Sequence, residues 1–170
     1  MVKGLTSTSG IIAVSSSVTE SAANTYTQLA VDLNLDPLNN EVFVVVAIDL
    51  NPQFPDALAG LDTSTQAALS TTSRTSLGFI SDFNVLASSS TAIRAAGFVD
   101  GGVGFSQQSL ETPPANLDYI GIVATNDVFL GVQGGNNLAA KVVGMRMWGY
   151  RARAASQIYA ALVQSEVLSA

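Results

Sequence analysis

The chain has 170 residues and a formal net charge of −6, and it contains neither cysteine nor histidine. A chain of this length fits one domain, and the missing residue types exclude disulfide bonds, thiolate zinc sites, cysteine nucleophiles and histidine-dependent catalytic triads. Only 12% of the residues are charged, against about 25% in an ordinary soluble domain. A compact monomer of this size would carry one charge per about 390 Å² of surface. The composition therefore predicts that contacts between subunits cover much of the surface.

The first 18 residues predict an N-terminal arm rather than a targeting segment. Lys3 is followed by Gly, Thr and Ser, and the apolar run Ile11–Val14 is too short for the core of a signal peptide. No stretch approaches 18 uninterrupted apolar residues, so we expect no transmembrane segment.

The next part of the chain reads as strands separated by turns. A polar strand is expected from Thr19 to Leu33, followed by a turn at Asp36–Asn40. Val42–Leu50 is almost entirely apolar and β-branched, which predicts a strand buried on both faces or at an interface. A loop then follows from Asn51 to about Asp62.

The middle of the chain predicts several short strands. A surface loop is expected at Ser88–Thr91 and a two-residue hairpin turn at Gly101-Gly102, and the paired prolines of Glu111–Ala115 predict a rigid connection outside any ladder. The expected strands are Gln66–Thr72, Leu77–Ile80, Asn84–Ala87, Gly97–Asp100 and Val103–Phe105.

Leu117–Tyr150 predicts an antiparallel meander of three consecutive strands. The strands are Asp118–Thr125, Val128–Gln133 and Ala139–Tyr150, and both gaps between them have the length and composition of tight turns. Tight turns exclude helical crossovers, so the domain should be all-β.

Arg151–Leu168 predicts a C-terminal helix, because it is rich in alanine and lacks glycine and proline. Its stripe at helical spacing consists of Ala155, Ile158, Tyr159, Leu162 and Glu166. We expect the helix to act in assembly by docking on a neighbouring subunit, although packing on its own subunit is an equal alternative.

Together these elements predict a single domain over residues 1–170, with residues 19–150 as the sandwich and 151–168 as the helix. The fold class is all-β: an antiparallel β-sandwich of jelly-roll type with about eight strands and a C-terminal α-helix.

Few residues suggest chemistry, and neither an enzyme nor a cofactor is expected. The glycine-rich segments lack the Gly-Lys-Ser/Thr ending and the following helix of a phosphate loop. The segment after the first polar strand alternates oxygen-bearing side chains, but Pro37 stands where a calcium loop of the EF-hand type has glycine. A turn capped by aspartate is favoured there over a looser cation site. The residues of that candidate site are Asp32, Asn34, Asp36 and Glu41.

Four of the seven basic residues lie close together in sequence near the C-terminus: Lys141, Arg146, Arg151 and Arg153. They could contact nucleic-acid phosphates, but pairing with carboxylates across a subunit boundary is favoured on a net-acidic protein. The large side chains nearby are candidate core or interface anchors. These anchors are Trp148, Tyr150, Ile158, Tyr159 and Leu162.

The series of short strands from Thr19 to Tyr150, the apolar strand Val42–Leu50 and the Ser/Thr/Gly/Asn-rich loops resemble the single-jelly-roll capsid proteins of small icosahedral viruses. The resemblance implies a coat subunit of the virion, assembled in the host-cell cytoplasm from copies of itself around a genome, with other virion proteins and nucleic acid as further partners. The alternatives are a capsid decoration protein and a carbohydrate- or ligand-binding β-sandwich. The ligand-binding alternative requires a solvent-facing aromatic platform, which Trp148 or Tyr119 would supply.

Overall fold

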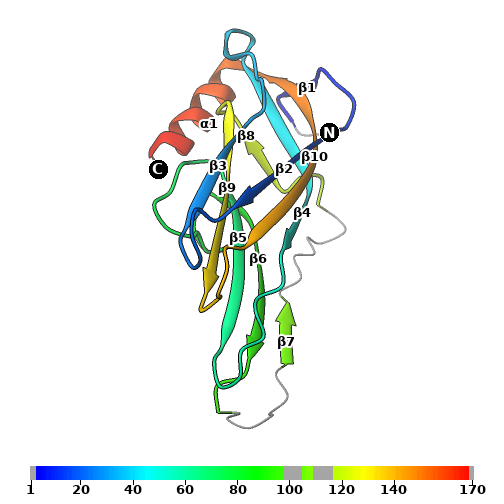
Figure 1. Cartoon of the computed structure of the whole chain (residues 1–170). Helices are drawn as coiled ribbons and strands as arrows, with labels where there is room; N and C mark the ends of the chain where they lie inside the picture. The colour runs from blue at the N-terminus through cyan, green and yellow to red at the C-terminus, as the bar shows by residue number, and fades with distance from the viewer. Residues whose placement is uncertain (1–2, 98–104, 109–116, 169–170) are drawn as a thin grey trace.

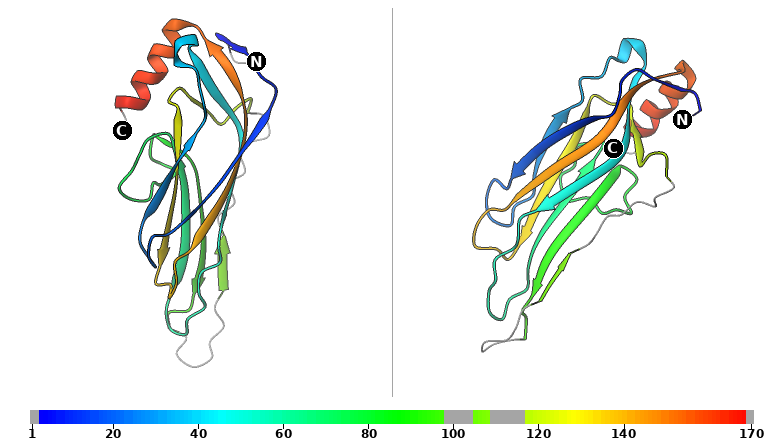
Figure 2. Two further views of the ribbon diagram at one scale, coloured as in Figure 1. Left: turned by 45° about the horizontal axis from the view of Figure 1, so that its top comes forward. Right: turned by 90° about the vertical axis from the view of Figure 1, so that its right-hand side faces the viewer.

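The computed structural model describes residues 3–97, 105–108 and 117–168. Two antiparallel sheets pack against each other, and one helix follows at the C-terminus (Figures 1 and 2). The all-β sandwich is therefore confirmed. The expected hairpin at residues 101–102, the connection at 111–115 and all but one residue of each strand expected at 97–100 and 103–105 lie outside the described residues.

Within the described residues, ten strands form the two sheets. Sheet A contains β1 (Leu5–Ser7), β2 (Ile12–Thr19), β4 (Glu41–Pro52), β8 (Gly121–Val123) and β10 (Val142–Ala154). Sheet B contains β3 (Thr27–Asp32), β5 (Thr63–Ser70), β6 (Val85–Arg94), β7 (Phe105–Gln108) and β9 (Asp127–Gly135). The helices are the 3₁₀ turn η1 (Pro37–Asn39) and α1 (Ser156–Leu168).

The strand order is that of a jelly roll. Sheet A runs β2-β10-β4-β8, with β1 beside the far end of β10, and sheet B runs β3-β9-β5-β6-β7. With the short strands β1 and β7 set aside, the first of the remaining eight strands pairs with the last, the second with the seventh, the third with the sixth and the fourth with the fifth. A two-stranded ribbon is thus wound so that successive strands alternate between sheets, except at its closed end, where β5 and β6 pair within sheet B.

The main core lies between the sheets, where apolar side chains alternate with outward-facing ones along each strand. Its largest fully buried members are Phe43 and Met147 from sheet A and Leu69 and Leu130 from sheet B. Burial of such side chains is the dominant stabilising contribution.

The predicted meander is wrong. Gly121–Val123 pairs with β4 in sheet A, the next strand, β9, pairs with β3 and β5 in sheet B, and β10 returns to sheet A. The two turns are therefore corners between sheets rather than hairpins. Short polar turns suit both kinds of connection, because each leads from one half-buried strand to another.

Residues 1–18 are not a free arm, because β1 and most of β2 lie within them and pair with β10. The single polar strand expected over Thr19–Leu33 is wrong, because the segment holds only the last residue of β2, then a turn in which Asn24 has φ 63°, and then β3 in the other sheet. Ser88–Thr91 lies inside β6 rather than in a loop, and Leu77–Ile80 lies in the loop between β5 and β6 rather than in a strand.

The C-terminal helix begins later than expected. Residues 151–154 continue β10, where they pair with β1 on one side and β4 on the other. This pairing outweighs the helical preference of an alanine-rich segment, because tertiary context routinely overrides a propensity of a few tenths of a kcal/mol per residue. In the described part of the chain, helices long and apolar enough to span a bilayer are absent.

Burial of Val42–Leu50 on both faces is confirmed at its N-terminal end. Phe43 and Val45 point into the main core, whereas Val42 and Val44 point to the outer face of sheet A, where α1 covers them. The buried residues under the helix, here called the helix-covered cluster, are Leu5, Val42, Val44, Ala124, Ala152 and Ala154.

Candidate functional site

Four of the five predicted anchors are used within the subunit. Tyr150, Ile158, Tyr159 and Leu162 are partly buried against the helix-covered cluster. The expectation that α1 docks on a neighbour is therefore replaced by its alternative, because the apolar stripe of α1 faces its own sheet.

A buried carboxylate fixes the far end of α1. Glu166 is only 8% exposed, and its two carboxylate oxygens accept hydrogen bonds from the backbone N–H groups of Ala124 (2.9 Å) and Thr125 (3.0 Å). The two amides lie between β8 and β9, so the bonds join α1 to the end of both sheets. Hydrogen bonds to an ionised group are about twice as strong as neutral ones.

Trp148 lies elsewhere, on the outer face of sheet A. It is half-buried, and in the ladder it stands between Ala13 of β2 and Ala47 of β4. Trp148 is therefore not an anchor of the core, and its alternative role as an interface anchor stays a prediction. The alternation along β10 places Met147, not Trp148, between the sheets.

Lys141 is removed from solvent by its own subunit. Its ammonium group is paired with the Asp56 carboxylate (Nζ–Oδ1 2.5 Å), and its backbone N–H donates to Glu20 Oε2 (2.8 Å). The side chain is only 5% exposed. Lys141 therefore holds the β4–β5 loop against the start of β10 and does not offer a contact to phosphate.

This ion pair makes stability depend on pH. The hydrogen bond from Lys141, helped by one from the backbone of Leu138, holds the pKa of Asp56 below its ordinary value of 3.8. The stabilisation is complete above that value and is lost as the pH falls through the lowered pKa of the folded state. We expect Asp56→Asn to lower the free energy of unfolding at pH 7, because it leaves the Lys141 ammonium buried without a counter-charge.

Urea unfolding at pH 7 and at pH 3 measures the effect, and the difference between Asp56→Asn and wild type should shrink at the lower pH. The matched control is Asp49→Asn, which changes an exposed carboxylate on the outer face of sheet A. A pH-independent difference for Asp56→Asn would contradict the assignment.

The three arginines do not form one patch. Arg151 is half-buried and donates to the backbone oxygen of Leu33 (3.0 Å), while Arg146 and Arg153 are exposed. Arg146 and Arg153 are seven residues apart on one strand, so their side chains point to opposite faces and start about 23 Å apart. The predicted concentration of positive charge is therefore dispersed.

The four residues of the candidate cation site do not converge on one point. Their segment instead forms the expected turn capped by an aspartate. Asp32 Oδ1 accepts from the N–H of Asn34 (2.6 Å) and the amide of Asn126 (2.7 Å), and Glu41 accepts from the N–H of Asp36 (3.0 Å). Asp36 caps η1 by accepting from the N–H of Leu38. In the described ranges, groups of three or more carboxylates suited to a metal ion are absent.

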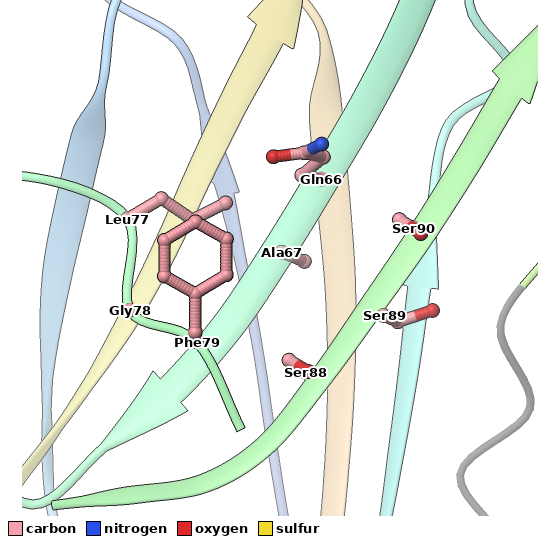
Figure 3. Close-up of a pocket in the computed structure, with 8 residues that line it drawn as sticks. All are labelled: Gln66, Ala67, Leu77, Gly78, Phe79, Ser88, Ser89 and Ser90. Carbon is pink, nitrogen blue, oxygen red and sulfur yellow. The ribbon is translucent and has the colours of Figure 1, made fainter. Parts of the chain in front are cut away.

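The outer face of sheet B carries a polar groove that the sequence did not indicate. Two adjoining cavities of about 350 and 120 Å³ share Gln66 on β5 and Ser90 on β6. Figure 3 shows Leu77 and Phe79 of the β5–β6 loop lying over the sheet beside Gln66. The described lining consists of Asp62, Thr63, Ser64, Gln66, Ala67, Leu77, Gly78, Phe79, Ser88, Ser89, Ser90, Ala92, Arg94 and Asn136.

The charged groups of this groove are already engaged with each other and with the backbone. Asp62 accepts from Arg94 (3.0 Å) and from the N–H groups of Ala95 and Ala96 (2.8 Å each). The bond from the Ala96 N–H, followed by that from Arg94, holds the pKa of Asp62 below its ordinary value. What the groove offers a ligand is hydroxyl and amide groups, which suit a small neutral polar molecule.

Large apolar side chains are exposed on the loops that flank the sandwich. Phe79 and Phe83 of the β5–β6 loop are 68% and 83% exposed, and Phe54 and Leu138 are also exposed. The backbone of Asp56 donates to Asn137, so the segments bearing Phe54 and Leu138 lie side by side. Exposed apolar groups gathered on loops are typical of surfaces that bind another protein.

Two acidic residues that matter structurally were missed by sequence reasoning. Glu20 is buried and accepts from the N–H groups of Gly134 (2.6 Å) and Lys141, which ties the end of β2 to both β9 and β10. Nothing local to Glu20 indicates this role. The position of Glu166, in contrast, indicates its role, because a carboxylate on the apolar stripe of a helix requires buried hydrogen-bond donors.

No protein-family model matches the chain, and no curated protein is significantly similar to it. The surfaces that remain open are the exposed loops, the polar groove and the outer face and edge of sheet A.

Proposed function

We propose that this chain is a coat subunit of a viral particle, which assembles with copies of itself into a shell around a genome. The observation that carries the proposal is the jelly-roll strand order, β2-β10-β4-β8 facing β3-β9-β5-β6. This fold builds many capsids but also serves other functions, so the fold alone is an analogy. The surface of the subunit supplies the further support.

The low charge supports an assembled state. The chain carries 20 charged residues in 170, about half the usual fraction. Two of the basic ones, Lys141 and Arg151, are withdrawn from the surface into contacts with Asp56 and Leu33. A lone subunit is thus poorly charged, whereas a subunit surrounded by copies needs fewer charges.

The exposed apolar side chains also support assembly. They are distributed over several loops, and Phe79 alone among them also lines the described groove of sheet B, so they suit a surface that meets several neighbours. They include Leu38, Phe54, Phe79, Ile80, Phe83, Leu117 and Leu138.

The ligand-binding alternative has weaker support. It needs an aromatic platform beside polar groups, but Trp148 lies on sheet A, and the exposed Tyr119 precedes β8 of the same sheet. The polar groove lies on sheet B and has Phe79 as its described aromatic member. A decoration protein would share the exposed loops and would differ in the size of its assembly.

The purified chain should form large, closed particles rather than persist as a monomer. The expected result is a fast-sedimenting species in analytical ultracentrifugation and uniform shells in negative-stain electron microscopy. Small rings that do not grow into shells would favour the decoration protein. A monodisperse 17.5 kDa species that persists at micromolar concentration would contradict the proposed function.

A further inference from the structure

β2 is the longest edge strand among the described residues. The two sheets end at β2 with β1, at β8 with the uncovered end of β4 (residues 46–52), at β3 and at β7. The uncovered end of β4 carries Asp49 and Pro52, which oppose pairing with another chain. β2 has eight residues, against six in β3, four in β7 and three in β8. Short edge strands protect a sheet against pairing with other chains, and β2 lacks this protection.

The backbone of β2 is available for a second ladder. The N–H of Glu20 donates to the backbone oxygen of Lys141 on β10 (2.9 Å). Backbone groups alternate along a strand, so Ile12, Val14, Ser16 and Val18 also face β10, and the residues between them face away. The outward-facing residues, here called the open edge of β2, are Ala13, Ser15, Ser17 and Thr19. Among the described strands β2 pairs only with β10.

The sequence of β2 has none of the usual devices against edge pairing. Gly4 through Thr19 contain no charged residue and no proline, and the ladder of β2 with β10 runs without a bulge. The competing edge β3 ends at Asp32, and the β5–β6 loop is bonded to its Gln28 through the N–H of Arg74 (3.0 Å). Ile11 and Ile12 at the start of β2 are 68% and 38% exposed, so an apolar surface adjoins the open backbone.

We propose that β2 pairs antiparallel with β2 of a second copy, about a twofold axis at Ser15, so that two A sheets become one continuous sheet. The partner is a second copy because the strand is neutral and its pattern is self-complementary. With Ser15 opposite its twin, Ile12 meets Val18 and Val14 meets Ser16 on the core-facing side. This inference rests on the proposed function and identifies the contact that forms the first building unit.

The side-chain pairs that each register would create across the two copies of β2 favour the one centred on Ser15. A shift that places Ser16 opposite its twin would bring Ile12 against Glu20, whose carboxylate is committed to the N–H groups of Gly134 and Lys141. The Ser15 register avoids this contact and covers the exposed Ile12 with an apolar side chain. Pairing of the same surface on both copies closes the interface, as in most homodimers.

Cross-linking tests the pairing and its register together. The chain contains no cysteine, so Ser15→Cys introduces a single thiol at an exposed position of β2. Twin residues of a bonded antiparallel pair have Cα atoms about 5.5 Å apart. We expect the shortest bifunctional thiol reagent to convert most of the Ser15→Cys protein to a covalent dimer.

Ser17→Cys is the matched control on the same strand and face. In the proposed register Ser17 lies opposite Ala13, so its twin is four residues along the ladder, about 14 Å away. It should therefore remain uncross-linked. Equal cross-linking of both variants would overturn the proposed register. Absence of cross-linking in Ser15→Cys would overturn the pairing itself.

A backbone variant gives an independent measurement. Ser17→Pro removes an N–H that faces away from β10, so it spares the ladder within the subunit. It should weaken the dimer at least tenfold in sedimentation equilibrium. Ala30→Pro, at an outward-facing position of the edge strand β3, is the control and should leave the dimer unchanged. A Ser17→Pro protein that is folded by circular dichroism and dimerises normally would contradict the proposal.

The two proposals fail separately. Wild-type shells without Ser15→Cys cross-linking would overturn the β2 pairing and leave the coat function standing. A dimer specifically cross-linked through Ser15→Cys that never grows further would support the pairing while contradicting the coat function.

Discussion

A chain that ends at Ala155 should unfold at a much lower urea concentration than the full-length chain. Removal of α1 exposes Val42 and Val44, which are fully buried on the outer face of sheet A. Exposure of a buried valine costs at least about 1.5 kcal/mol, so these two alone should lower the free energy of unfolding by about 3–6 kcal/mol. A domain of this kind has about 5–15 kcal/mol in total, so the truncated chain should be barely folded. Urea titration followed by circular dichroism measures the difference.

Point variants on α1 separate this packing role from the loss of chain length. Leu162→Ser removes an apolar side chain that packs on the helix-covered cluster, whereas Ala161→Ser makes a polar substitution on the exposed side of the same helix. Leu162→Ser should reproduce part of the destabilisation and Ala161→Ser should have little effect. A truncated chain as stable as wild type would show that α1 is dispensable for the fold and would reopen its role in assembly.

Gly149→Ala should destabilise the protein by about 3 kcal/mol, at the upper end of the cost of overpacking a core. Gly149 lies where the register of β10 against β4 shifts, and a Cβ there would overlap the backbone oxygen of Val44 and the ring of Phe43. The backbone oxygen belongs to a central strand and cannot move aside as a flexible side chain would. The melting temperature should fall by about 6–12 °C, which differential scanning calorimetry measures.

Gly144→Ala is the matched control on the same strand. A Cβ at Gly144 would meet no atom within 4 Å. Replacement of glycine by alanine at such a position also reduces the entropy of the unfolded chain, so the variant should equal or slightly exceed wild type in stability. Equal losses from both substitutions would indicate a general sensitivity of β10 rather than a close approach at Gly149.

The sequence predicts those strands whose residue pattern alone requires an extended, buried chain. Val42–Leu50 is a strand because a run of β-branched residues suits a pleated surface buried on both faces. The pairing of strands did not follow from pattern, because each half-buried strand suits either sheet equally well. For the same reason the local pattern of residues 151–154 predicts a helix, because the strands that keep them extended, β1 and β4, are distant in sequence.

The surface could be predicted less well than the fold. Closeness in sequence places Lys141 with three arginines, but its partner Asp56 is 85 residues away. The groove of sheet B likewise depends on the β5–β6 loop folding back over Gln66, which no local signal indicates. The anchors Tyr150, Tyr159 and Leu162 were recognised as packing residues, yet the sequence left open whether their partner was the same subunit or a neighbour.

The pairing of β2 with β10 also sets the order of events during synthesis. Arg146 stands opposite Ser15 in that ladder, so β2 receives its partner strand only after a further 131 residues have been made. Contacts between residues so distant in sequence form late and slowly, because a long loop must close first. Before β10 is made, β4 and β8 can pair in sheet A, but β2 has no place in that sheet. The proposed pairing of β2 with a second copy therefore requires a subunit in which β10 has already folded. The jelly-roll winding would in this way delay the proposed assembly until β10 has joined each subunit.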